Sequence, residues 1–591
     1  MYIISCQIHH RSSVALFKDA DLLYYNECSR LTRKKHSRSF SGLEIEKIKS
    51  IVGLDPCILI LTGYDAATPF EVDTFCKYFE HYKVSIQECI SFSQSHHLCH
   101  AARAFFASGF EEATIIVWDG RGSNFNLSEE NCGYETTSIF TFDKSQNFKC
   151  IYKRLFVREN FNDTLQVKTN LDLTAKYEKK LPYTFDDQTV WHITDKHDIG
   201  KVYNIITGHV GFDRRYDHEG KTMGLQSYGS LDSNIITYNS DGQINFKEDL
   251  IKKYQKKEFL FYINEEKYTH LNSKNHQALK DLAYTGQQVI QAMGEKTIEY
   301  ALRNSAKTTQ NVVFTGGVSL NVVANNAYRE KFAKNINFYI EPLCGDEGNS
   351  IGAGILFYYD LYKKGKFSAF TEIKNKFINR TLYIGESNLN TDIHLHPKEK
   401  MFDCADMSIA AAQLLEQGHL VSIFHGKAEA GPRALGNRSI LFDPRKINGK
   451  DIVNSVKMRE YFRPFAFTMM AEYANEWFYM NGLQESPFMM YAVKVKEQYK
   501  NRIPAVIHVD NTCRIQTVKK EQNPILYELL FEFYKKTDIP GVLNTSFNLA
   551  GDPIVETIED ALSTLRRSQL EYLFLPEIKK MIFVQNNEKI Q

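Results

Sequence analysis

Residues 431–445 read GPRALGNRSILFDPR, and no other stretch of this chain says as much about it. The stretch places Arg433, Arg438 and Arg445 among glycines and prolines. Glycine lets a backbone approach a ligand closely, and arginine presents a planar, permanently charged fork that matches phosphate or carboxylate oxygens. The apolar residues 440–442 follow directly, so we expect the arginines to extend from a buried strand. This stretch therefore predicts a rigid oxyanion site, against the plainer alternative of a solvated, arginine-rich turn.

Length and composition place the chain among ordinary globular proteins. Its 591 residues suffice for roughly two to four domains, and 43% hydrophobic with 24% charged residues is typical of that class. A formal net charge of +1 indicates no partner from bulk charge. The 11 cysteines are scattered without a Cys-x-x-Cys pair, which argues against a thiolate zinc site and a disulfide framework. Because signal-peptide and membrane-span patterns are lacking, we expect a cytoplasmic protein without membrane contact.

The order of predicted elements is that of an α/β protein. Three closely spaced strand patterns open the chain and predict an antiparallel meander: 2–8, 13–17 and 21–25. Three later strand patterns end in glycine or aspartate and enter helices: 113–123, 311–326 and 336–354. Ligands of α/β proteins gather at such strand ends. The Lys- and Asn-rich stretch 363–397 is weakly periodic, so we place a domain boundary there, and no internal repeat is evident.

Two histidines and two carboxylates predict a metal site. His96 and His100 are four residues apart in a predicted helix, so they project from one face, whereas His97 points off that face. An isolated pair of this kind is more often a solvated or satisfied face. Asp119 and Asp346 shift the balance, because each stands where a strand ends. Such a ligand set suits Fe²⁺, Mn²⁺ or Zn²⁺, and the ligand types do not choose among them.

Several segments carry candidate phosphate-binding groups. In the N-terminal half, EGKT at 219–222 lacks the first glycine of a P-loop, and Gly316 with Gly317 joins a strand to a helix. The C-terminal half is richer, through segments 456–467, 508–518 and 543–555. These segments contribute Lys457, Arg459, Arg463, His508, Arg514, Asn544, Ser546 and Asn548. We expect Arg459 to be an ordinary surface ion pair and the others to serve a site for phosphorylated ligands.

Taken in order, four blocks resemble the NodU/CmcH-type O-carbamoyltransferases of nodulation-factor and antibiotic biosynthesis: GPRALGNRSILFDPR, VKMREYFRPFAF, HVDNTCRIQTV and NTSFNLAGDPIVETIEDAL. The resemblance spans nearly the whole chain. It implies an N-terminal ASKHA-type (actin/Hsp70-like) domain at 1–370 and a C-terminal YrdC-like α/β domain at 395–591. The YrdC-like domain would make carbamoyl adenylate from carbamoyl phosphate and ATP, with Mg²⁺. The metal-bearing domain would then transfer the carbamoyl group to an acceptor hydroxyl.

The resemblance also implies roles for individual residues. His10 would be the general base, and Arg463, Arg514 and Asp119 would be catalytic. The metal, with Fe²⁺ as first choice, would be held by His96, His100, Asp119 and Asp346. Positions that would bind the cofactor and carbamoyl phosphate are Lys221, Gly316, Gly317, Asn321, Lys427, Arg433, Arg438, Lys457, His508, Asn544 and Ser546. Lys427 stands where relatives usually carry arginine, so it keeps the charge and loses the fork.

The chain departs from the family around the expected acceptor side. Relatives begin with a GHDAS-like motif, whereas residues 9–13 read HHRSS and place Arg11 at the aspartate position. An EEER-like run has become ECSR at 27–30. Further basic residues near the motifs are Arg38, Arg103, Arg121, Arg214 and Arg215. This pattern suits a polyanionic acceptor, and we hypothesise a hydroxymethyl pyrimidine, such as 5-hydroxymethylcytosine, in DNA or a nucleotide.

Three alternatives stay open from the sequence. A small-molecule acceptor, such as a sugar or antibiotic hydroxyl, uses the same chemistry and explains everything except the added arginines. Threonylcarbamoyl chemistry on tRNA is a second, and the fused domain order speaks against it. A non-enzymatic nucleotide-binding regulator is a third, which the completeness of the metal and arginine sets disfavours. For assembly we consider a homodimer.

Overall fold

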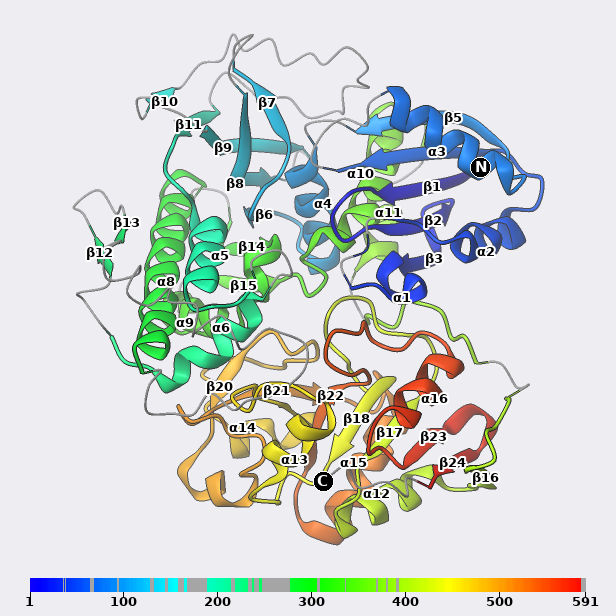
Figure 1. Cartoon of the computed structure of the whole chain (residues 1–591). Helices are drawn as coiled ribbons and strands as arrows, with labels where there is room; N and C mark the ends of the chain where they lie inside the picture. The colour runs from blue at the N-terminus through cyan, green and yellow to red at the C-terminus, as the bar shows by residue number, and fades with distance from the viewer. Residues whose placement is uncertain are drawn as a thin grey trace.

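The computed structural model describes residues 1–35, 37, 39–63, 69–92, 95–127, 132–143, 147–157, 164–166, 189–213, 218–231, 236–238, 244–246, 277–305, 309–334, 336–367, 370–378, 381–389 and 393–585. Arg38, Arg214 and Arg215 lie outside these residues. The chain is a mixed α/β protein with three large sheets, as the strand and helix patterns predict. Two of these sheets form the upper part of Figure 1 and the third, built from yellow-green to red segments, forms the lower part.

The first sheet has the order β3-β2-β1-β4-β5. Its strands are β1 (Tyr2–Gln7), β2 (Ser13–Lys18), β3 (Asp21–Glu27), β4 (Cys57–Thr62) and β5 (Ile86–Phe92). The first three strands pair antiparallel, which confirms the predicted meander, and β4 and β5 continue parallel to β1. Every residue of β1 and β4 is buried, because helices or the second half of the domain cover both faces.

The second sheet repeats this order. Five adjacent strands run β9-β8-β6-β14-β15, so the first of them in the chain, β6, again lies in the middle, with two antiparallel strands on one side and two parallel strands on the other. These strands are β6 (Ala113–Trp118), β8 (Cys132–Phe142), β9 (Phe148–Val157), β14 (Asn311–Thr315) and β15 (Asn337–Ile340). β7 (Asn124–Asn126), β10 (Thr164–Gln166) and β11 (Val190–Thr194) extend it, and β12 (Ile236–Tyr238) pairs β13 (Ile244–Phe246) separately. A duplicated order of this kind is the ASKHA architecture, and the repeat is visible in topology although the sequence shows none.

Two helices pack between the duplicated sheets and bring distant residues together. Nearly all of α4 (His96–Ser108) is buried, and α10 (Asn349–Lys363) crosses it. Gly352 makes the crossing close, since a Cβ there would lie 2.1 Å from the carbonyl oxygen of Cys99. Because the two backbones nearly touch, the N-terminal turns of both helices face one small region of the molecule.

The C-terminal sheet has nine strands in the order β16-β24-β23-β17-β18-β22-β19-β21-β20. They are β16 (Glu399–Asp403), β17 (Val421–Phe424), β18 (Arg438–Phe442), β19 (Ala466–Met470), β20 (Ala492–Lys494), β21 (Thr512–Val518), β22 (Gly541–Ser546), β23 (Tyr572–Leu575) and β24 (Lys580–Val584). The strand predicted to follow the arginine loop is β18, which is fully buried at the centre of the sheet. The loop of residues 431–437 is therefore anchored to the core of this sheet.

The remaining α-helices lie around these sheets: α1 (Cys28–Thr32), α2 (Gly42–Val52), α3 (Pro69–His81), α5 (Ile199–His209), α6 (Glu219–Leu225), α8 (Gln277–Ser305), α9 (Val322–Phe332), α11 (Phe370–Phe377), α12 (Met407–Gln417), α13 (Gly449–Val456), α14 (Ala474–Trp477), α15 (Pro524–Thr537) and α16 (Ile558–Arg566). α11 begins at residue 370, where the N-terminal domain was expected to end, and it packs on the core between the first two sheets through Phe370, Ile373 and Phe377. Among the helices that the structure describes, none is both long and apolar enough to cross a membrane.

Candidate active site

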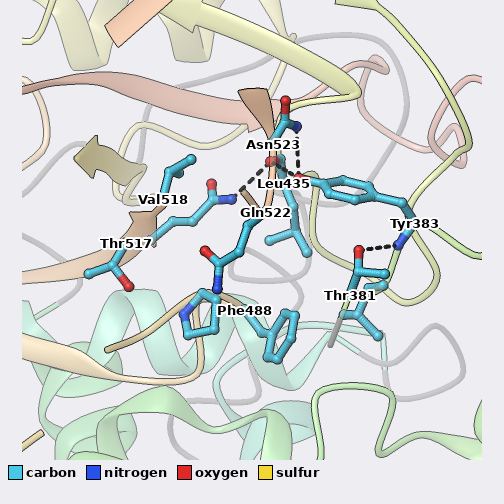
Figure 2. A pocket seen from close by; sticks show the side chains of 11 residues that line it. Thr381, Tyr383, Leu435, Phe488, Thr517, Val518, Gln522 and Asn523 are labelled. Carbon is cyan, nitrogen blue, oxygen red and sulfur yellow. Dashed lines mark hydrogen bonds between the residues drawn. The ribbon is translucent and has the colours of Figure 1, made fainter. Parts of the chain in front are cut away.

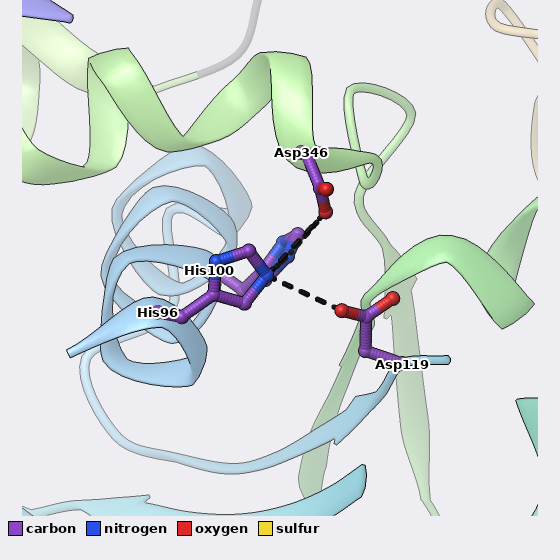
Figure 3. Close-up of side chains that lie close together, drawn as sticks. All are labelled: His96, His100, Asp119 and Asp346. Atoms are coloured by element: carbon purple, nitrogen blue, oxygen red, sulfur yellow. Dashed lines mark hydrogen bonds and ion pairs between the residues drawn. The ribbon is translucent and has the colours of Figure 1, made fainter. Parts of the chain in front are cut away.

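The predicted metal ligands converge from three elements. α4 supplies His96 and His100, the end of β6 supplies Asp119, and the short 3-10 turn Asp346–Gly348 before α10 supplies Asp346. All four side chains are buried, and one ligand atom from each lies within 4.8 Å of the others. We call these residues the metal quartet. Figure 3 shows the two imidazoles facing both carboxylates.

The distances within the metal quartet favour a shared cation. The Nε2 atom of His96 lies 3.2 Å from Asp119 Oδ2, 3.4 Å from Asp346 Oδ1 and 3.3 Å from Nε2 of His100. Burial opposes charge on His96, but Asp346 and Asp119 outweigh it and raise its pKa to about 10. Two imidazole nitrogens and two carboxylate oxygens at this spacing fit one divalent metal ion, and the donor types do not select which one.

A buried support behind the metal quartet escaped the sequence analysis. One carboxylate oxygen of Glu135, on β8, accepts hydrogen bonds from the backbone N–H groups of His97 and Ser123, at 3.1 and 3.0 Å. Ser123 Oγ in turn accepts from the backbone N–H of His96 at 3.1 Å. Glu135 is fully buried and ion-paired with buried Lys153. Glu135 thus fixes the loop after Asp119 to the first turn of α4, and only the fold brings these positions together.

His10 reaches the metal quartet from a constrained turn between β1 and β2. His9 and Arg11 adopt positive φ angles of 78° and 48°, a conformation that is uncommon for residues other than glycine. The turn brings His10 Nδ1 to 3.4 Å from Asp346 Oδ2 and Arg11 Nη1 to 3.1 Å from Glu347 Oε2. Two adjacent residues therefore engage two adjacent carboxylates, and His10 sits beside the quartet with 23% of its side chain exposed.

Two glycines and their neighbours complete this region. Gly316 has a φ of 88°, and a Cβ there would lie 2.1 Å from the carbonyl oxygen of Trp118, so only glycine fits. A Cβ on Gly317 would lie 3.4 Å from Asp119 Oδ1, which places the predicted nucleotide loop directly beside the metal quartet. Asn321, predicted to bind the nucleotide, instead caps α9 and exchanges hydrogen bonds with Gln287. Its amide is thus occupied within the fold.

A second cluster gathers cationic side chains of the C-terminal part. We call Arg433, Lys457, Arg459, Arg463 and Arg514 the cation cluster. Burial lowers the pKa of Lys457, Arg459 and Arg514 well below their ordinary values, and the neighbouring guanidinium groups lower each of them further. Burial lowers the pKa of Arg433 to about 10 in the same way. Like charges that are buried together are unfavourable unless an anion joins them.

The contacts of the cation cluster leave donors for such an anion. Nε of Arg433 and Nε of Arg514 are buried and have no hydrogen-bond partner among the residues described. Arg459 donates to Asn454 at 2.6 Å and lies over the ring of Phe465, so the expectation that it forms a surface ion pair is wrong.

Glu460 is the carboxylate that the cluster does contact. It lies 3.8 Å from Arg463, and it also pairs with Lys221 from α6 at 2.7 Å. Lys221, predicted to bind the cofactor, therefore comes to the edge of the cation cluster from the N-terminal part. One carboxylate shared between two cations leaves the cluster with excess positive charge.

Two residues predicted to bind ligands join the wall of this cluster. Lys457 Nζ donates to the carbonyl and side-chain oxygens of Asn548, both at 2.8 Å, and to the carbonyl of Ser546. Ser546 Oγ donates to Asn548 Oδ1 at 2.7 Å. Lys427 lies on the surface, and its backbone carbonyl accepts from Asn437.

Three other residues that were predicted to bind ligands make contacts within the fold. Arg438 is fully buried, stacks on Phe424 and donates to a ring of main-chain carbonyls, including Ser387 O and Gly426 O at 3.0 Å. Asn544 donates to Thr468 and Gln516 between strands of the sheet. His508 donates to Gly224 O at 2.8 Å and so joins the two parts of the chain. These contacts serve the backbone and the core, while Nδ1 of His508 and Oδ1 of Asn544 are buried without a partner among the described residues, so binding by these residues stays a prediction.

Of the described arginines that suggested a polyanionic acceptor, Arg11 and Arg103 pair with buried carboxylates, and the neighbouring Arg30 and Arg33 are also held inside the molecule. Arg30 is buried and donates to Glu429 O and Gly431 O, at 3.0 and 2.9 Å. Arg33 donates to Ile554 O at 2.8 Å and Pro553 O at 3.1 Å, and buried Arg103 pairs with Glu341. Arg121 is exposed, next to Tyr134. Arg30 and Arg33 therefore hold the N-terminal part against the C-terminal part.

A separate pocket lies behind the arginine loop. Figure 2 shows Tyr383 and Phe488 beside Leu435, and Tyr383 Oη and Gln516 Nε2 each donate to Leu435 O at 2.8 Å. The remaining lining residues are Thr381, Leu382, Pro487, Thr517, Val518, Gln522 and Asn523. Neither the metal quartet nor the cation cluster contributes to it, so this pocket supports the loop and lies apart from the candidate chemistry.

Comparisons with known proteins match both parts of the chain. A family model described as Carbamoyltransferase N-terminus matches residues 57–355, and one described as Carbamoyltransferase C-terminus matches residues 412–580. Nodulation protein NolNO of Sinorhizobium fredii is 27% identical over 95% of this chain and 78% of its own length. Nodulation protein NolO of Bradyrhizobium diazoefficiens is 33% identical over 48% of this chain and 52% of its own. Among solved structures, HypF of T. kodakarensis covers 64% of this chain and 49% of its own at 12% identity, with a TM-score of 0.32. With both family models matched in order along one chain, this protein belongs to the carbamoyltransferase family and is a carbamoyl-transferring enzyme.

Proposed function

We propose that this enzyme activates the carbamoyl group of carbamoyl phosphate as carbamoyl adenylate and transfers it to an acceptor hydroxyl. The observation that carries the first step is the cation cluster, whose buried positive charges exceed the contacting carboxylate of Glu460. Phosphate groups of ATP and of carbamoyl phosphate would supply the missing negative charge. We assign this step to a YrdC-like C-terminal domain at 395–591, with Arg463 and Arg514 stabilising the phosphoryl oxygens.

The atoms of the two steps balance without an external oxidant or reductant. Carbamoyl phosphate and water give carbamate and phosphate; a carbamate oxygen then attacks the α-phosphorus of ATP and displaces pyrophosphate. The acceptor hydroxyl next attacks the carbamoyl carbon, its proton passes to a base, and AMP leaves. We assign this base to His10; its Nδ1 contact with Asp346 and the 23% exposure of its side chain support the assignment.

The metal quartet would hold the divalent ion of the transfer step. His96, His100, Asp119 and Asp346 would be its ligands, and Fe²⁺ is the first ion to test, before Mn²⁺ and Zn²⁺. A bound divalent ion supplies Lewis-acid stabilisation to developing negative charge. Gly316 and Gly317 lie beside Asp119 and would receive the nucleotide part of the intermediate at this end.

The loop that carries Arg433 links the two sites. Arg433 Nη2 donates to Leu320 O, in the turn that follows Gly317. Gly431 packs against Leu343, three residues before Asp346, and its backbone N–H donates to Glu27 at 2.6 Å. The loop of residues 431–437 therefore contacts the loop of Gly316 and Gly317 and the segment that leads to Asp346, and its Arg433 belongs to the cation cluster. We propose that the intermediate passes along this loop, where exclusion of water would protect a hydrolysable species.

The direct test is release of AMP and pyrophosphate from ATP. We expect both products to form when carbamoyl phosphate is present, and neither to form when it is replaced by acetyl phosphate. Chromatographic separation of the nucleotides measures this. ADP as the product, or AMP release that ignores carbamoyl phosphate, would contradict the activation step.

For the acceptor, we propose a small hydroxylated molecule such as a sugar. The main support for DNA or a nucleotide was the added arginine set, and of its described members Arg11 pairs with Glu347 and Arg103 pairs with Glu341. Among the described members of that set, Arg121 is the one that is exposed. Mass spectrometry of candidate acceptors, incubated with enzyme, ATP and carbamoyl phosphate, would identify the carbamoylated class. Carbamoylation of hydroxymethylated DNA that weakens steeply as salt rises would overturn the small-molecule acceptor.

A further inference from the structure

The side-chain amide of Asn349 lies against the far side of the His96 ring. Asn349 is fully buried at the first position of α10, three residues after Asp346. Its Nδ2 lies 3.3 Å from Nδ1 of His96, and its Oδ1 has no hydrogen-bond partner among the described residues. A buried amide oxygen without a partner is costly, so this arrangement calls for an explanation.

The orientation of that amide decides which nitrogen of His96 carries hydrogen. A neutral imidazole has one N–H, and the other nitrogen has the lone pair. If the amide N–H donates to Nδ1, the hydrogen of His96 must sit on Nε2, the atom that faces Asp119 and Asp346. In that form Nε2 has no lone pair to offer a metal ion.

Turning the amide over gives the oxygen a partner and changes the tautomer of His96. The Oδ1 atom then accepts a hydrogen bond from Nδ1–H of His96, and the oxygen gains its partner. The lone pair of Nε2 now points into the metal quartet, where Nε2 lies 3.2 Å from Asp119 Oδ2 and 3.4 Å from Asp346 Oδ1. Either end of an amide fits the same space, so the turn requires no movement of the backbone.

The backbone holds Asn349 in this place. The turn that presents Asp346 runs directly into α10, so ligand and amide are fixed to the same helix start. The crossing of α10 over α4 is close because Gly352 lies against Cys99. A short side chain at position 349 therefore reaches the ring of His96 without a bridging residue.

We propose that Asn349 is a positioning residue of the metal centre: it accepts the Nδ1–H bond of His96 and so fixes the tautomer and the ring angle with which His96 binds the ion. This inference rests on the metal centre of the proposed function. Partners that accept from the outer nitrogen of a ligand histidine orient the ring and raise its basicity, and removing one costs about 10–100-fold in metal affinity.

The test measures binding of Mn²⁺ alone, without substrates or turnover. The full chain is stripped with a chelator and titrated with Mn²⁺, and electron paramagnetic resonance counts the free ion. Asn349→Ala and Asn349→Leu both remove the acceptor, and the leucine variant keeps the volume. We expect each to weaken Mn²⁺ affinity by about 10–100-fold. Asn349→Asp keeps an acceptor at the same place, so its affinity should equal or exceed that of the wild type.

A matched control separates this role from general packing. Asn325 is also buried in the N-terminal part, and it donates to Ser319 O and Met490 O, away from the metal quartet. Asn325→Ala should leave Mn²⁺ affinity unchanged even if it lowers the melting temperature of the metal-free protein. The proposal is overturned if Asn349→Leu binds Mn²⁺ like the wild type, or if Asn349→Asp loses as much affinity as Asn349→Leu. A wild type that does not bind Mn²⁺ would also overturn it, and carbamoyl phosphate-dependent AMP release would show whether the activation step survives.

Discussion

The metal quartet and the cation cluster differ in how their buried charges are balanced. In the metal quartet, buried carboxylates and histidines already compensate one another, with Nε2 of His96 within 3.4 Å of both Asp119 and Asp346. In the cation cluster, burial and then neighbouring guanidinium groups, Arg463 among them each time, lower the pKa of Lys457, Arg459 and Arg514, and Glu460 is the carboxylate that the described part of the cluster contacts. The charges of the metal quartet are therefore balanced when no ligand is bound, whereas those of the cation cluster are balanced only when an anion binds.

The two sites are therefore preorganised for binding in different ways. The metal quartet owes its geometry to helix crossing and backbone support from Glu135, so its shape does not depend on what binds. The cation cluster stores unfavourable repulsion that an anion relieves, so part of its binding free energy comes from the protein itself. Variants that change charge without changing shape should therefore affect the two sites in different ways.

The largest expected effect comes from breaking the metal quartet alone. His96→Ala removes a ligand, so we expect acceptor carbamoylation to fall by about 1,000-fold, because Lewis-acid stabilisation is worth several kcal/mol. The cation cluster is untouched, so AMP release from ATP and carbamoyl phosphate should persist. Both rates can be measured in one assay by mass spectrometry and nucleotide chromatography. Equal loss of both activities would mean that the two sites are not separable.

The next largest effect comes from breaking the cation cluster alone. Arg514→Ala should lower AMP release by about 100–1,000-fold, the typical cost of removing one preorganised charge-stabilising donor. Arg445→Ala is the matched control, since Arg445 belongs to the same sequence block but pairs with Asp443 at 2.8 Å and is 34% exposed. Its rate should match the wild type. Should both variants lose activity alike, position in the cluster would not be what matters.

A smaller effect tests whether Arg438 belongs to the fold rather than to the cation cluster. Arg438→Ala leaves several buried carbonyls without donors, so we expect a loss of at least about 3 kcal/mol in unfolding free energy. The KM for ATP of the folded fraction should stay at the wild-type value. Denaturant unfolding and steady-state kinetics measure the two quantities. A large rise in KM with unchanged stability would return Arg438 to the binding site.

The smallest effect concerns the carboxylate of the cation cluster. Burial alone would raise the pKa of Glu460, but Arg463 and Lys221 outweigh it and lower the pKa from 4.5 to about 2. Because the folded pKa is depressed, the stability that Glu460 contributes is fully present above pH 4.5 and is lost as the pH falls toward about 2.

Glu460→Gln should therefore remove up to about 3 kcal/mol of stability at pH 6 and flatten the acid limb of the stability curve. It should also increase the stabilisation given by added pyrophosphate, because the cluster becomes more positive. Glu497→Gln, at a site with 83% exposure, is the control and should change neither quantity. An unchanged acid limb in Glu460→Gln would exclude this carboxylate as the cluster's counter-charge.

The contrast between the sites also explains what the sequence could predict. Histidines and aspartates at strand and helix ends are scarce in a core, so His96, His100, Asp119 and Asp346 could be named as ligands, and the structure brings all four together. Arginine is ambiguous, because the same fork that binds phosphate also satisfies main-chain carbonyls. Arg438 and Arg30 are examples, and only their surroundings reveal it.

Topology and long-range supports were the other limits of sequence reasoning. The opening meander has short, regular spacing, so it was predictable, whereas the duplicated strand order depends on pairings between residues as distant as β6 and β14. Glu135 and Asn349 act through backbone and ring nitrogens of residues far away in the chain. Such contacts leave no local pattern of spacing or composition.

The repeated strand order relates two residues of the candidate active site, His10 and Asp119. In each copy the first strand leads into the turn toward its antiparallel neighbour, and that turn carries His10 in one copy and Asp119 in the other. These two residues are therefore counterparts under the internal pseudo-symmetry of the domain, and both face Asp346 and its neighbours. Under the proposed function, one of these turns carries the base of the transfer step and the other carries a ligand of the metal ion. The proposed roles of His10 and Asp119 therefore differ although their positions in the repeated fold correspond.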